Sequence, residues 1–127
     1  MFQSPAHDYT DAPISLDVVC KLNHPSTYIL QAEISSWRAA IRKGAMLILD
    51  CAATPCDGSI VMCHLSGQIA LRRLRLRPSP RLEDLDFPEQ FDAYDIDDDN
   101  PHAIVKGVIT HILNDARTGE FDDSPFM

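Results

Sequence analysis

The 127 residues contain no apolar run that approaches the ~20 residues of a membrane-spanning helix. The N-terminus also lacks the basic-then-apolar layout of a signal peptide. We therefore expect a cytoplasmic protein that makes no contact with a membrane. Hydrophobic content of 45% and charged content of 24% are ordinary for one soluble domain of this length.

Paired metal-ligand spacings are missing as well. The four cysteines (Cys20, Cys51, Cys56 and Cys63) form no C-x-x-C pair, and the five histidines show no paired spacing. Zinc sites usually carry such pairs. The sequence therefore predicts no metal site and no cofactor. We expect the cysteines to be small buried thiols that stay reduced.

Positive charge is scarce in the second half of the chain. Residues 1–77 carry eight Lys/Arg and six Asp/Glu, a net +2, whereas residues 78–127 carry three and thirteen, a net −10, and the two add to −8. Binding to DNA phosphates depends on Lys and Arg. We therefore expect no direct sequence-specific DNA binding, and the acidic half suits a basic protein surface instead.

What the chain does contain is a series of short runs rich in β-branched and apolar residues, which predict strands. The run 45–50 is almost continuously apolar, as in a strand buried on both faces. Ser66-Gly67 separates two further runs and predicts a β-hairpin. A mainly β fold follows. The predicted strands are 27–32, 45–50, 60–65, 68–77, 81–85 and 103–113.

Composition divides the chain into three parts. Residues 1–13 hold two prolines and no helical period, and predict an extended N-terminal arm. Residues 14–117 contain all the predicted strands and form the β domain. Within that domain, the acidic segment after residue 85 and up to residue 101 predicts a solvated loop. Residues 118–127 predict a disordered acidic tail.

Three segments carry a family resemblance in a constant order and with near-constant spacing. They are Phe2-Gln-Ser-Pro-Ala-His-Asp-Tyr9, the stretch from Gly58-Ser-Ile-Val61 to Leu71-Arg-Arg-Leu-Arg-Leu-Arg-Pro78, and Lys106-Gly-Val-Ile-Thr-His111. Together they resemble the UmuD branch of the LexA-like self-cleaving peptidases, in its processed form UmuD′. The resemblance covers residues 2–78 and 103–117, is weak over 79–102, and implies a LexA/UmuD C-terminal peptidase-like β domain.

The resemblance implies positions for a Ser/Lys dyad. In the family, a neutral lysine takes the proton of a serine, which attacks a peptide bond in the protein's own N-terminal arm. The serine position falls on Ser36, within Ile34-Ser-Ser-Trp37, and the lysine position falls on Arg72. A guanidinium stays protonated and cannot act as a general base. We therefore predict an inactive homologue, in which Arg72 bonds to backbone carbonyls or a carboxylate.

A second departure from the family supports the same prediction. The family's scissile bond lies just before the segment that Phe2 begins here, and only Met1 precedes that segment in this sequence. We therefore expect a chain that resembles the processed form from synthesis.

The family resemblance also implies partners. The processed family dimer joins an error-prone Y-family (UmuC-like) DNA polymerase and a RecA filament in the SOS response to DNA damage. We expect the same accessory role in translesion synthesis here, with no peptidase activity. We expect a homodimer formed through the last strand, at Val108, Ile109, His111 and Ile112.

Two other functions stay open at this point. The chain could be a serine autopeptidase in which Lys43 or His64 replaces the lysine as base for Ser36, or in which Ser35 reacts. It could instead be a regulator that forms heterodimers with UmuD- or LexA-type relatives.

Two charged segments need separate interpretations. The segment Gly119-Glu-Phe-Asp-Asp-Ser-Pro-Phe126 resembles the acidic tip of bacterial single-strand-binding protein, so Phe126 is a hypothetical partner-binding residue, although Met127 follows it. Arg73, Arg75 and Arg77 predict a solvated strand face that pairs with the acidic segment 83–99.

Overall fold

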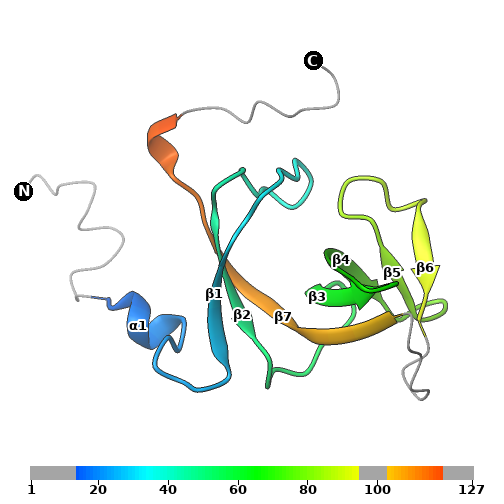
Figure 1. The fold of residues 1–127 in the computed structure, drawn as a ribbon, viewed down its shortest axis with the longest axis horizontal. Helices are drawn as coiled ribbons and strands as arrows, with labels where there is room; N and C mark the ends of the chain where they lie inside the picture. Colours follow the sequence, from blue (N-terminus) through cyan, green and yellow to red (C-terminus); the bar gives the residue numbers. More distant parts are fainter. Residues whose placement is uncertain (1–13, 95–102, 119–127) are drawn as a thin grey trace, which may run out of the picture.

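The computed structural model describes residues 14–94 and 103–118, which form one antiparallel sheet in the order β1-β2-β7-β3-β4-β5-β6 (Figure 1). The mainly β fold is confirmed. The arm 1–13, the aspartates at 97–99 and Phe126 lie outside the described residues. The elements are α1 (Leu16–Val19), β1 (Thr27–Gln31), β2 (Met46–Asp50), β3 (Ile60–Leu65), β4 (Gln68–Arg75), β5 (Arg81–Glu83), β6 (Phe91–Ala93), β7 (Ala103–Leu113) and the 3-10 helix η2 (Ala116–Thr118).

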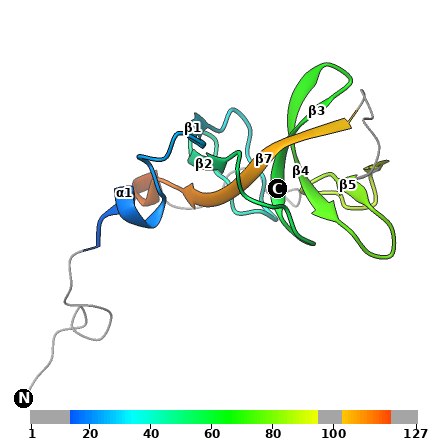
Figure 2. The same ribbon diagram turned by 90° about the horizontal axis from the view of Figure 1, so that it is seen from below.

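Strand β7 belongs to both halves of the sheet. Its residues 108–113 pair with β2, and its residues 103–108 pair with β3. Figure 2 shows β7 running from the β1–β2 half to the β3–β4 half. At Gly107 a Cβ atom would lie 2.8 Å from Leu49 Cδ1 and 3.1 Å from the Asp50 carbonyl oxygen. A side chain at this position would push the two strands apart, so glycine permits the close approach.

Two hydrophobic clusters cover opposite faces of the sheet. Val108 and Ile109 are neighbours in sequence but belong to different clusters, because successive side chains of a strand point to opposite faces. The first cluster is Ala32, Ile41, Ala45, Leu47, Leu49 and Ile109, and the second is Val61, Cys63, Leu74, Leu82 and Val108.

Strand β4 meets both clusters. Its apolar residues change phase between Leu71 and Leu74, yet its pairing with β3 is regular from Ile60↔Arg73 to Leu65↔Gln68. Leu71 packs against the first cluster and Leu74 lies within the second. The apolar residues of β4 therefore change phase because the first hydrophobic cluster covers one face of the strand at Leu71 and the second cluster covers the other face at Leu74. No bulge in the pairing with β3 is needed to explain the change.

The arginines at the end of β4 and just after it differ from their predicted arrangement. Arg73 and Arg75 are half-buried, and only Arg77 is exposed as expected for a solvated face. Arg75 does pair with the acidic segment, since its Nε lies 3.3 Å from Glu83 Oε1. Glu83 is 5% exposed and also contacts Arg81 at 2.9 Å. A carboxylate this deeply buried is held by two guanidinium groups.

The prediction of a loop after residue 85 was wrong in one place. Strand β6 adds to the edge of β5, with Phe91, Asp92 and Ala93 all exposed. A three-residue exposed strand has no alternation that sequence reading could detect. In β2, Leu47, Ile48 and Leu49 are buried as predicted, whereas Met46 is half-exposed. No helix among the described residues is long and apolar enough to cross a membrane.

Candidate functional site

Ser36 lies at the base of the tight turn that joins β1 to β2. Its backbone exchanges two hydrogen bonds with Ile41, with N···O distances of 2.8 and 2.9 Å. Ala40 closes the turn with a positive φ of 57°. Ile41 anchors the turn in the first hydrophobic cluster, and Ser36 itself is only 4% exposed.

The Ser36 hydroxyl is engaged by a carboxylate. It donates a hydrogen bond to Asp86 Oδ1 at 2.7 Å and accepts one from the Ala39 N–H at 3.3 Å. The same Asp86 oxygen accepts the Arg38 N–H at 3.2 Å. Sequence reasoning missed Asp86, which lies 50 residues from Ser36 in a segment where the family resemblance is weak.

The loop that carries Asp86 is fixed by its own hydrogen bonds. Asp84 Oδ1 accepts the N–H groups of Asp86 at 2.9 Å and of Phe87 at 3.0 Å. The Asp84 N–H in turn donates to the Gln90 carbonyl at 2.9 Å. Leu85 packs against the first cluster, which also contains Ile41. The carboxylate is therefore held in place independently of its bond to Ser36.

Arg72 is half-buried and bonds to the backbone of its own strand. Its Nη1 donates to the Leu71 carbonyl at 2.8 Å, a backbone acceptor of the kind that the sequence predicted for Arg72. The register places Arg72 opposite Val61, on the face of the second cluster, while Leu71 packs against the first. Within residues 14–94 and 103–118, no hydrogen bond joins Arg72 to Ser36.

The charge of Arg72 acts on a buried thiol. Burial raises the pKa of Cys63 to about 11, and the nearby positive charge of Arg72 opposes this increase. Cys63 is the buried thiol that the sequence predicted. Cys51 and Cys56 are exposed, and Cys20 is half-buried. The prediction that all four cysteines are buried was therefore wrong. The two exposed cysteines lie in the connection between β2 and β3.

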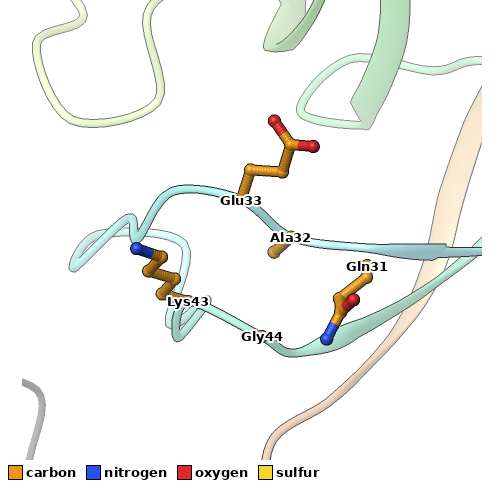
Figure 3. A pocket seen from close by; sticks show the side chains of 5 residues that line it. All are labelled: Gln31, Ala32, Glu33, Lys43 and Gly44. Carbon is orange, nitrogen blue, oxygen red and sulfur yellow. The ribbon is translucent and has the colours of Figure 1, made fainter.

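Neither alternative base hydrogen-bonds to Ser36 in the part of the chain that the structure describes. The Lys43 N–H donates to Ser35 Oγ at 3.0 Å, and His64 pairs within the sheet with Ile69. Lys43 lines a shallow open pocket, where its ammonium and the Glu33 carboxylate point in different directions (Figure 3). The charges in this pocket therefore do not converge on a common point. The described residues also hold no group of three or more His, Cys, Asp or Glu side chains suited to a metal ion.

The four residues expected at a dimer interface differ in exposure. Val108 and Ile109 are 9% and 8% exposed and belong to the subunit's own core. Ile112 is half-buried and packs against the first cluster, whereas His111 is exposed. Most of the surface that these four positions offer to another molecule is therefore at His111.

Comparison with known proteins decides the family. No family model matches the chain. It is 34% identical to protein ImpA of Salmonella typhimurium over 119 residues, 91% of this chain and 78% of ImpA. It is 37% identical to protein MucA of Escherichia coli over 114 residues, 88% of this chain and 76% of MucA. The chain belongs to the UmuD-like branch of the LexA family.

A third relative is similar over a shorter stretch. Protein SamA of Salmonella typhimurium is 31% identical over 78 residues, 61% of this chain and 56% of SamA. The relatives support a UmuD-like role in error-prone DNA repair, within a family that contains peptidases.

The hydrogen bond between Ser36 and Asp86 can be measured by a double-mutant cycle. We expect Ser36→Ala and Asp86→Ala each to lower the free energy of unfolding by about 1–3 kcal/mol, because each substitution removes one partner of a hydrogen bond between a buried hydroxyl and a carboxylate. The double variant should lose little more than either single one, and urea unfolding measures all three. Glu89→Ala, at an exposed position of the same loop, is the matched control. Fully additive losses would mean that the two side chains do not interact.

Proposed function

We propose that this protein is a UmuD′-like accessory subunit of an error-prone Y-family (UmuC-like) translesion polymerase, and that it has no peptidase activity. The observation that carries the loss of activity is the engagement of the Ser36 hydroxyl by the Asp86 carboxylate at 2.7 Å. The role with a polymerase is supported by the similarity to ImpA and MucA.

The chemistry of a Ser/Lys dyad needs a neutral amine beside the serine hydroxyl. The corresponding position carries Arg72, whose guanidinium stays protonated and donates to a backbone carbonyl. The group within hydrogen-bonding reach of Ser36 is instead a carboxylate, which is a much weaker base than an amine. Ser36 is also 4% exposed, so a peptide bond could reach it only if the turn opened.

We expect no Ser36-dependent cleavage of an uncleaved UmuD-type relative between about pH 7 and about pH 10, since no group beside Ser36 becomes a neutral amine in that range. Gel electrophoresis and mass spectrometry of the incubated mixture measure the product. Ser36→Ala is the matched control. A product that forms with the unchanged chain and disappears with Ser36→Ala would overturn the inactive assignment and favour an autopeptidase with another base.

We propose that the active form is a homodimer joined through β7. Residues 109–113 of β7 pair with β2 on one side, and no strand among the described residues pairs with them on the other. An open antiparallel edge can pair with its own copy about a two-fold axis. The adjoining sheet face is apolar around His111, with Ile29, Met46 and Leu113 exposed by 54%, 50% and 48%.

We expect His111→Glu to convert the dimer into a monomer, because two carboxylates would face each other across the two-fold axis. Sedimentation velocity gives the mass of each form. Lys106→Glu, at an exposed position in the other half of β7, should leave the dimer intact. A monomeric unchanged chain, or a dimer that His111→Glu leaves intact, would contradict this interface.

The polymerase assignment is tested by co-purification. We expect the tagged chain, expressed together with a Y-family polymerase subunit and an uncleaved UmuD-type relative, to recover the polymerase. Addition of a RecA filament should retain the complex. Recovery of only the relative as a heterodimer would contradict the accessory role and identify the chain as a regulator of its relatives.

A further inference from the structure

Strand β6 is the last strand of the sheet, and no strand among the described residues pairs with its outer side. Within the described residues it pairs with β5 alone, and Figure 1 shows it at the outer edge of the β3–β6 half. All three of its residues, Phe91, Asp92 and Ala93, are exposed. This edge plays no part in the site around Ser36 or in the proposed dimer.

The hydrogen-bond pattern fixes which backbone groups face outward. The Tyr94 N–H donates to the Pro80 carbonyl at 3.2 Å, and the Asp84 N–H donates to the Gln90 carbonyl at 2.9 Å. Bonded and non-bonded pairs alternate along an antiparallel ladder, so the bonded pair between these two is Leu82↔Asp92. The N–H and C=O groups of Phe91 and Ala93 therefore point to the open side of β6.

The side chains at this edge suit a protein contact. Phe91 and Phe87 are 56% and 45% exposed. The Arg81 guanidinium lies 5.7 Å from the centre of the Phe91 ring and orients the ring. Strand β6 contains no proline and no lysine, which are residues that natural sheets use to block an open edge.

The negative charge around β6 indicates which kind of segment could pair with its outer edge. Residues 81–94 contain five acidic residues and one basic residue, Arg81, which already pairs with Glu83 at 2.9 Å. Glu89 and Asp92 are exposed beside the open edge. A second copy of this chain, with a net charge of −8, would be repelled by this region. A segment that carries Lys or Arg would be attracted.

We propose that β6 binds an extended basic segment of another protein by strand addition. The backbone of the segment bonds to Phe91 and Ala93. Because side chains alternate along a strand, apolar residues of the segment lie on the Phe91 face and Lys or Arg residues lie on the Asp92 face. This binding surface is separate from the proposed accessory role and does not depend on it.

A fluorescent peptide of about eight residues with alternating Lys and Val tests the proposal, and the matched peptide with Glu in place of Lys is its control. Fluorescence anisotropy gives the affinities, and slowed amide exchange at Phe91 and Ala93 locates the peptide. We expect the basic peptide to bind and the acidic one not to bind. Equal binding of the two peptides, or protection elsewhere on the chain, would overturn the proposal.

Two variants separate the backbone contribution from the charge contribution. Ala93→Pro removes an outward N–H and should weaken binding by about tenfold or more, whereas Ala93→Val keeps the N–H and should bind normally. The double variant Glu89→Lys with Asp92→Lys changes only exposed side chains and should bind the acidic peptide in place of the basic one. If Ala93→Pro does not fold, the charge-reversal variant decides, and unchanged peptide preference in it would contradict the proposal.

Discussion

Among the described residues, β7 is the strand whose backbone pairing joins the β1–β2 half of the sheet to the β3–β6 half, through residues 108–113 and 103–108. Gly107 makes this possible, since even a methyl group there would meet Leu49 at 2.8 Å. The Ser36 turn belongs to the first half, and the Asp86 loop belongs to the second. Their hydrogen bond is therefore a second connection between the halves, beside the packing of the first hydrophobic cluster.

The two-sided burial of β4 explains why Arg72 and its neighbours behave differently. Leu71 packs against the cluster that anchors the Ser36 turn, so the next side chain, Arg72, points to the face of Val61 and Cys63. Its guanidinium remains close to the strand by bonding to the Leu71 carbonyl. This carbonyl gives the half-buried cation an acceptor, which matters because burying an unsatisfied charge is costly.

Sequence reasoning found the strands that bury apolar residues, such as 45–50 and 103–113, because burial leaves a readable pattern. It also predicted that Arg72 bonds to a backbone carbonyl or a carboxylate, and the structure shows the carbonyl. It missed β6, which buries nothing, and Asp86, whose partner lies 50 residues away. An aspartate in an acidic loop is expected to be solvated. Only the three-dimensional arrangement of the two loops gives this one a buried partner.

The bond between Ser36 and Asp86 gives the serine a use that does not require catalysis. A hydroxyl has one donor and two acceptor positions, and here the donor and one acceptor position are taken by Asp86 and the Ala39 N–H. Alanine at position 36 would take from the half-buried Asp86 Oδ1 its bond to the hydroxyl and leave it the bond from the Arg38 N–H. These hydrogen bonds stabilise the turn, so they favour serine over alanine at position 36 even without any catalytic role. In this geometry, retention of the serine is no sign of retained hydrolysis.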